Sequence, residues 1–151
     1  MIKKFNFIIF IILIISLKLY ADENKYFLTL RSDKVNVRLG PAFEYPVKFV
    51  YKKKYLPLLV IEKSDVWRKI SDLNYNTGWI HISKLSKKKA AIVINEKSII
   101  FKNPTKYSNP MASLAKGRLL LIKKCKKNWC KITTGDFGGW IKKNYLWGKI
   151  N

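Results

Sequence analysis

A chain of 151 residues is long enough for one ordinary domain or for two very small ones. Hydrophobic residues make up 48% of it and aromatic residues 14%, which excludes an intrinsically disordered chain, because such chains lack the side chains that bury a core. The 31 basic residues outnumber the 9 acidic ones and give a formal charge of +22, so we expect a surface that attracts anions.

The N-terminal segment predicts export from the cytoplasm. Lys3 and Lys4 precede an apolar run over residues 5–17, and Lys18 ends that run. A membrane-spanning helix needs about 20 apolar residues, so the run favours a cleaved signal peptide over a retained anchor, with cleavage after Ala21. We therefore assign residues 1–21 to a signal peptide and expect a periplasmic or secreted protein.

The lysine-rich composition has two interpretations. Only four of the basic residues are arginines, namely Arg31, Arg38, Arg68 and Arg118. In an exported protein the charge would attract the phosphates of lipid or lipopolysaccharide, or the carboxylates of peptidoglycan stem peptides, and no nucleic-acid partner is expected. The alternative is that the lysines, with the many Ile and Asn residues, reflect codon bias in an AT-rich genome.

The rest of the sequence contains one pattern twice. The first copy consists of Val35-Asn-Val-Arg-Leu-Gly-Pro41, Leu58–Ile61, Trp67–Ile70 and Gly78-Trp79-Ile80. The second copy has its counterparts at residues 98–104, 119–122, 129–132 and 139–141. The offset drifts only from 63, between Pro41 and Pro104, to 61, between Gly78 and Gly139. This indicates a duplication with small loop changes.

Each copy is expected to consist of short β-strands. No stretch after residue 21 keeps the period of 3.6 that a helix requires, and apolar segments alternate with turn formers. A hairpin is predicted in each copy, from Leu58–Lys63 and Val66–Asp72 and from Leu119–Cys125 and Asn128–Thr133. The predicted fold class is all-β, with about five strands per copy closing into a small barrel. The short basic segment 86–89 should hold the two barrels close together.

These motifs resemble the bacterial SH3-like (SH3b) family. The resemblance rests on the segment 35–41, Tyr45-Pro46, Trp67-x-Lys-Ile70, and Gly78-Trp79-Ile80 before Leu85. It spans residues 26–86 and 90–148, and the second copy is similar to a variant with a cysteine on each side of the hairpin turn. The resemblance implies two tandem SH3-like β-barrels. Members of the family commonly serve as targeting modules, often attached to cell-wall hydrolases, so it also implies a binding role.

The two cysteines, Cys125 and Cys130, flank the predicted turn of the second hairpin. In an oxidising compartment such a pair is a disulfide candidate. A metal site would need more ligands than two thiols, and the only histidine, His81, is far away in sequence. The disulfide is therefore favoured, and no metal site is expected.

Candidate catalytic groups are few. Lys142 stands in the second copy where His81 stands in the first, which favours a structural or surface role for the histidine. The nine carboxylates fall mostly in predicted loops, and no pair has a spacing that suggests acid–base work. Asp136-Phe-Gly-Gly139 leads from strand to strand, not into a helix that would bind phosphate. We expect no enzymatic activity and no cofactor.

Aromatic side chains are better candidates for a binding role. Alternation along the strands places Trp67 on the face opposite to that of Ile70, and Trp129 on the face opposite to that of Ile132. Both tryptophans are then outside the barrel core, either packed under a loop or displayed in a groove for a ligand. Further loop aromatics are candidates to complete such grooves, namely Tyr45 and Tyr75 in the first copy and Tyr107 and Phe137 in the second.

These features favour two functions. The leading one is a non-catalytic periplasmic or cell-envelope binding module that recognises peptidoglycan stem peptides or an envelope protein in aromatic grooves. The alternative is an electrostatic binder of anionic envelope lipid or polysaccharide. Its lysine clusters would be residues 52–54, 87–89, 123–124 and 126–127. A groove should depend on single aromatic residues, whereas a diffuse charge should weaken by degrees and release its ligand as salt rises.

Overall fold

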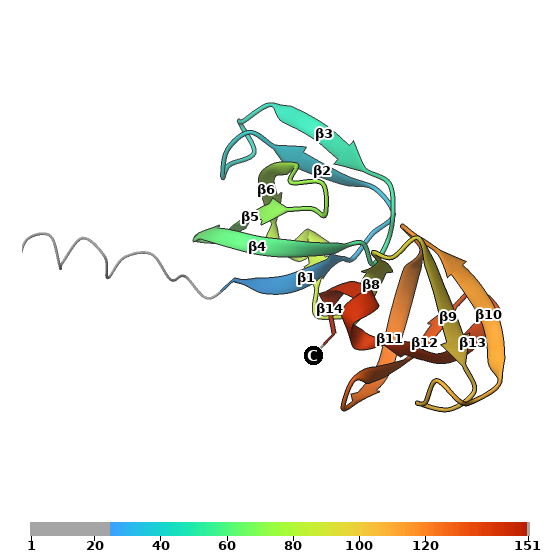
Figure 1. Cartoon of the computed structure of the whole chain (residues 1–151). Helices are drawn as coiled ribbons and strands as arrows, with labels where there is room; N and C mark the ends of the chain where they lie inside the picture. Colours follow the sequence, from blue (N-terminus) through green and yellow to red (C-terminus); the bar gives the residue numbers. More distant parts are fainter. Residues whose placement is uncertain (1–24, 151) are drawn as a thin grey trace, which may run out of the picture.

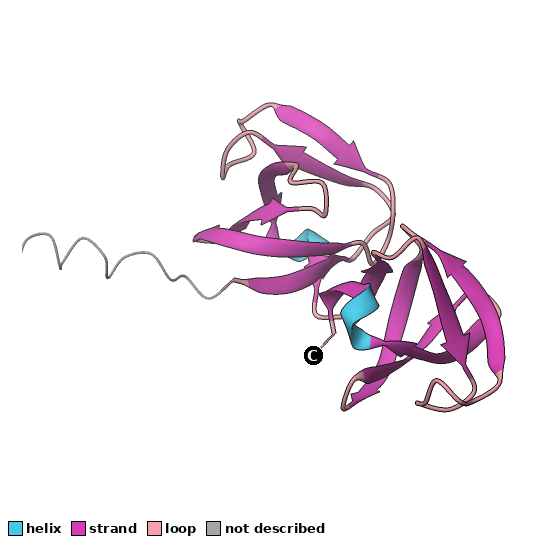
Figure 2. Cartoon of the chain, viewed as in Figure 1, coloured by secondary structure: helices cyan, strands magenta, loops and turns pink. Residues whose placement is uncertain are grey.

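Residues 25–150 of the computed structural model are described, and they form two β-domains that follow each other along the chain (Figure 1). The predicted signal peptide lies outside these residues. The described part consists of strands, loops and two 3-10 helices of three residues each (Figure 2), which confirms the all-β prediction. No helix within residues 25–150 has the length and apolar character needed to cross a membrane.

The first domain contains one seven-stranded sheet in the order β3-β2-β6-β5-β4-β1-β7, with neighbouring strands antiparallel. Its strands are β1 (Tyr26–Leu30), β2 (Val35–Arg38), β3 (Val47–Tyr51), β4 (Pro57–Ser64), β5 (Trp67–Ser71), β6 (Thr77–His81) and β7 (Leu85–Ser86). The 3-10 helix η1 (Ile82–Lys84) lies between β6 and β7.

The second domain repeats this topology, with the order β10-β9-β13-β12-β11-β8-β14. Its strands are β8 (Ala90–Val93), β9 (Lys97–Phe101), β10 (Pro110–Ala115), β11 (Leu119–Lys126), β12 (Trp129–Thr134), β13 (Phe137–Lys142) and β14 (Leu146–Lys149). The 3-10 helix η2 (Lys143–Tyr145) precedes β14. Each strand of the second domain thus has its counterpart seven strands earlier in the chain, as expected for a duplicated domain.

Both predicted hairpins are present, as β4–β5 and β11–β12, but each domain has seven strands where about five were expected. The difference includes the short closing strands β7 and β14. Leu30 of β1 pairs with Leu85 of β7, and Val93 of β8 pairs with Leu146 of β14. Local turn signals do not reveal such pairs, because the partners are separated by almost the whole domain.

Each domain has its own hydrophobic core built from equivalent residues. Val37, Leu58, Ile70 and Ile80 belong to the first core. Ile100, Leu120, Ile132 and Ile141 take the same places in the second core. All eight side chains are fully buried, so the isoleucine face of each hairpin points inward, and the hairpin tryptophans belong to neither core cluster.

The predicted disulfide between Cys125 and Cys130 is present, with an S–S distance of 2.00 Å. The two residues are register partners across the β11–β12 hairpin. Lys63 and Arg68 are the corresponding partners in the first domain. Only the second hairpin is therefore cross-linked, and both cysteines of the chain are used.

The two domains contact each other through β14, which lies against β1 and β4 of the first domain. The rings of Phe27 and Trp147 meet edge to face with centroids 4.9 Å apart. Gly148 has a φ of +142°, and a Cβ there would lie 2.6 Å from the Ala90 oxygen and 2.9 Å from the Cβ of Pro57. The interface therefore depends on a glycine at this point, since any side chain would force β14 away from β8 and from the first domain.

Ser98 is a buried polar residue of the second domain. It takes the place of Val35 in the second domain, is fully buried, and its hydroxyl has no hydrogen-bond partner among the described residues. Because an unpaired buried hydroxyl is costly, we expect Ser98→Val to raise the free energy of unfolding by about 1 kcal/mol, measured by urea denaturation. The reciprocal variant Val35→Ser should lower it. If Ser98→Val were destabilising, the hydroxyl would have to be paired in solution.

Candidate functional site

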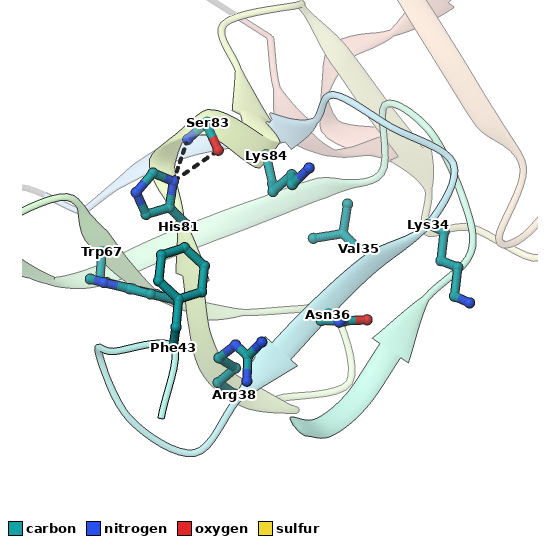
Figure 3. A pocket seen from close by; sticks show the side chains of 9 residues that line it. All are labelled: Lys34, Val35, Asn36, Arg38, Phe43, Trp67, His81, Ser83 and Lys84. Carbon is teal, nitrogen blue, oxygen red and sulfur yellow. Dashed lines mark hydrogen bonds between the residues drawn. The ribbon is translucent and has the colours of Figure 1, made fainter. Parts of the chain in front are cut away.

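The first domain carries a groove of about 330 Å³ (Figure 3). Two separate stretches of the sequence build it: strand β2 with the loop 39–46 that follows it, and the start of β5 and end of β6 with helix η1. The sheet brings them together because β6 is hydrogen-bonded between β2 and β5. The residues that line it are Lys34, Val35, Asn36, Arg38, Phe43, Trp67, His81, Ser83 and Lys84.

Three rings gather at one end of the groove (Figure 3). The ring of Phe43 lies 5.0 Å from that of Trp67, near edge-to-face, and is stacked 5.5 Å from that of His81. Trp67 and His81 also meet edge to face at 5.3 Å. These are distances at which aromatic pairs attract each other beyond their buried area. The rings form one apolar surface from a loop and two strands.

The members of this cluster differ sharply in exposure. Trp67 is 6% exposed, whereas Phe43 is 63% exposed. Trp67 thus lies under the loop, as one of the two sequence interpretations had it, and it also lines the groove. Phe43 is the ring that a ligand would meet first, because it presents most of its surface to solvent.

His81 links the aromatic cluster to helix η1. It is the N-cap of that helix, and its Nδ1 accepts a hydrogen bond from the backbone N–H of Ser83 at 3.3 Å. The Ser83 hydroxyl lies 2.8 Å from the same nitrogen. Because Nδ1 is an acceptor, the proton of the neutral ring belongs on Nε2. The histidine therefore holds the end of β6 in place while one face of its ring stacks on Phe43.

The groove is positively charged. Lys34, Arg38 and Lys84 line it, and no carboxylate does. Arg38 donates a hydrogen bond from Nη1 to the Tyr45 carbonyl at 2.7 Å, and its guanidinium lies 5.7 Å from the Phe43 ring. It thereby ties the loop 39–46 to strand β2. Cations that line one groove without acids favour an anionic ligand.

Comparison with known families decides what kind of domain carries this groove. Residues 31–87 and 95–148 both match the bacterial SH3 domain family. The chain belongs to that family. Domains of this family are cell-wall binding modules. Two domains of the family make up nearly all of residues 25–150. No curated protein matches the chain as a relative.

Solved structures resembling this pair of SH3 domains include NlpC2 from Trichomonas vaginalis, with 10% identity, a TM-score of 0.39, and coverage of 85% of this chain and 49% of that one. An NlpC/P60 family protein from Bacillus cereus has 10% identity and a TM-score of 0.35, and the match covers 80% of this chain and 55% of that one. The chain therefore spans about half the length of these proteins.

The six sequence-predicted site residues are scattered over the two SH3 domains. Only Trp67 lines the groove of the first. Tyr45 is 47% exposed and packs on Gly40, where a Cβ would come within 2.6 Å of the ring. Tyr75 and Tyr107 are 86% and 85% exposed, and Phe137 is 55% exposed. These three do not line any of the cavities described for residues 25–150.

Trp129 occupies a different environment from its counterpart Trp67. It is half-buried, and its ring meets that of Phe101 edge to face at 5.7 Å. It lines a cavity of about 640 Å³ together with Lys142, Lys143 and Ile150, among others. The two hairpin tryptophans are therefore equivalent in sequence but not in surroundings.

Sequence reasoning did not select Phe43, Arg38 or His81 for the site. One signal was available, since Lys106, Phe101 and Lys142 stand at these places in the second copy. Positions that differ in chemistry between two otherwise similar copies indicate a surface rather than a core. The aromatic neighbours of His81 are distant from it in sequence.

A polar cluster elsewhere in the first SH3 domain has a structural role. The Tyr51 hydroxyl donates to Asp72 Oδ2 at 3.0 Å, and Asp72 Oδ1 accepts from the backbone N–H groups of Asn74 and Asn76. Burial, with the hydrogen bond and charge of Asp72, raises the pKa of Tyr51 far above its ordinary value, so the phenol stays neutral. This cluster fixes the loop that carries Tyr75. Within residues 25–150, no group of three or more His, Cys, Asp or Glu side chains is placed to hold a metal ion.

Proposed function

We propose that this protein is a non-catalytic binding module of the cell envelope, and that its first SH3 domain recognises peptidoglycan stem peptides. The observation that supports this most is the groove in which Phe43 covers Trp67 and His81 beside Arg38, Lys34 and Lys84. The proposal places the protein in the periplasm or outside the cell, with a signal peptide cleaved after Ala21.

The chemistry of the groove suits a short peptide that carries carboxylates. An exposed aromatic ring offers a flat apolar surface for small aliphatic side chains at little entropic cost. The planar guanidinium of Arg38 matches the geometry of a carboxylate, and the two lysines add mobile positive charge. An acidic segment of an envelope protein presents the same groups, so the experiment must distinguish it from the stem peptide as the occupant of the groove.

The proposed function is non-catalytic because the groove offers no assembled nucleophile and base. His81 and Ser83 are within hydrogen-bonding distance, but the backbone N–H of Ser83 donates to the same Nδ1, which makes the pair a helix cap. A nucleophile–base pair also needs a third group that orients the base. No carboxylate lines this groove to do so. The groove therefore contains recognition groups and lacks an assembled catalytic set.

Binding of the purified protein to insoluble peptidoglycan tests this proposal. We expect Phe43→Ala to weaken binding about tenfold or more, the loss that is typical of an exposed aromatic hot spot. Tyr75→Ala is the matched control, since it also removes an exposed aromatic ring from the first domain but lies outside the groove. It should bind like the wild type.

Comparison at low and high salt separates the electrostatic alternative. A groove that uses aromatic contacts should retain much of its binding when exposed charges are screened at about 1 M salt. Binding that disappears with salt and is unaffected by Phe43→Ala would instead favour a diffuse lysine surface for anionic lipid or polysaccharide. If the protein captured an envelope protein and did not bind peptidoglycan, the ligand would be that protein and not the stem peptide.

A further inference from the structure

The second SH3 domain contains a groove at the same place as the first. It has a volume of about 170 Å³ and is lined by Lys97, Ile99, Phe101, Lys106, Lys142 and Tyr145. These residues are the sequence counterparts of Lys34, Asn36, Arg38, Phe43, His81 and Lys84, all of which line the first groove. The two grooves are thus built by equivalent strands, loops and 3-10 helices.

The chemistry of this place has changed between the copies. Lys106 replaces the exposed Phe43, and Lys142 replaces His81, so two rings of the first groove become ammonium groups. Phe101 replaces Arg38, which removes the one guanidinium. The second groove therefore has three lysines from three different elements, with apolar and aromatic side chains between them, and no carboxylate lines it.

The three lysines are not neutralised by the protein. Within residues 25–150 the salt bridges are Lys69–Glu62 and Lys116–Glu96, and neither involves a lysine of this groove. Lys142 is half-buried, and its Nζ lies 5.7 Å from the centre of the Tyr145 ring, which also lines the groove. Lys97 and Lys106 are exposed, and the Nζ of Lys106 lies 5.0 Å from the centre of the Tyr107 ring, which does not line the groove. Three lysines without a salt-bridge partner thus line one groove and give it a positive potential.

We infer that this second groove binds a phosphate monoester. Such a group carries about 1.5 to 2 negative charges at neutral pH and three acceptor oxygens, which matches three ammonium donors. A single carboxylate would leave two of the lysines without a partner and is better matched by arginine, which this groove lacks. The inference concerns a different domain and a different ligand from the proposed function, so either can fail alone.

The size and walls of the groove agree with this ligand. A volume of about 170 Å³ leaves room for a phosphate group and the first atoms of its carrier. Phe101, Ile99 and Tyr145 offer apolar contact to that carrier. The carrier is either a sugar or the glycerol of a lipid headgroup, and both present the same phosphate chemistry.

Calorimetric titration of the full-length protein with a glucose phosphate monoester tests the inference. Saturable binding is expected, with no binding of glucose and much weaker binding of acetate. Lys106→Gln and Lys142→Gln should each weaken it about tenfold, the size of one lost charge-assisted hydrogen bond. Lys126→Gln is the matched control, since it removes the same charge from an exposed position in the same domain outside this groove. It should change binding little.

The carrier is identified by a second arm with phosphatidylcholine vesicles that contain or lack phosphatidic acid. Binding to the phosphatidic acid vesicles that depends on Lys106 and Lys142 would support the inference and assign the phosphate to a lipid headgroup. Binding of the glucose phosphate alone would support it and assign the phosphate to a saccharide. Absence of binding in both arms, or equal weakening by Lys126→Gln, would overturn it. Phe43→Ala should leave both arms unchanged.

Discussion

Replacing Trp67 by alanine is expected to lower the free energy of unfolding of the first domain by about 3 kcal/mol, as for other buried aromatic side chains. The side chain is 6% exposed and packs against the rings of Phe43 and His81 at 5.0 and 5.3 Å. Its removal leaves a cavity beneath the loop 39–46, because the strands on either side are held by the sheet. Urea denaturation of the purified protein measures this loss.

The equivalent substitution in the second domain is the control. Trp129 is half-buried and its contact with a ring is that with Phe101, so Trp129→Ala should cost clearly less than Trp67→Ala. Equal losses, or a loss at Trp67 below about 1 kcal/mol, would mean that Trp67 is not a packed residue in solution. Because Trp67 is packed, Trp67→Ala would alter folding and recognition together. Binding is therefore tested at Phe43.

Replacing Gly78 by alanine is expected to cost about 2 kcal/mol through overpacking. A Cβ at this position would lie 2.4 Å from Cγ1 of Val37 and 3.0 Å from the Arg38 carbonyl oxygen. Strand β2 could relieve this contact only by moving away from β6, which would displace Arg38 from the groove. The substitution should therefore lower both stability and peptidoglycan binding.

Thr77→Ala, in the same strand and partly exposed, measures the ordinary cost of alanine at this edge of β6. We expect it to cost less than about 1 kcal/mol and to leave binding intact. If Gly78→Ala behaved like Thr77→Ala in denaturation, then the close approach of β2 to β6 would not explain why the Gly-Trp-Ile motif begins with glycine. Gly139 of the second domain makes the same approach, with a would-be Cβ 2.9 Å from the Phe101 oxygen.

Much of the fold was predictable because its signals are local. The hairpins β4–β5 and β11–β12 follow from alternation and turn residues, and the Cys125–Cys130 bridge follows from two cysteines at register positions of one hairpin. The repeated motifs gave the duplication. The closing strands β7 and β14 were missed, since Leu85 and Leu146 pair with residues at the opposite end of their domains.

The site was predictable only in part because its contacts are long-range. Strand alternation placed Trp67 off the core face, but nothing local shows that Phe43 folds back onto it or that His81 joins the cluster. Residues that look alike in sequence also differ in whether they line a groove. Tyr75 and Tyr107 are exposed loop aromatics like Phe43, yet they lie outside every cavity described for residues 25–150.

The most direct test of the central claim is nuclear magnetic resonance of the protein during titration with a soluble peptidoglycan stem peptide. We expect saturable shifts of the Trp67 indole N–H and of the Phe43 and His81 amides, because these residues line the groove of the first domain. The Trp129 indole and the hairpin lysines 126 and 127 should not move. Shifts confined to the lysine clusters, or no saturable shift at Phe43 and Trp67, would contradict it.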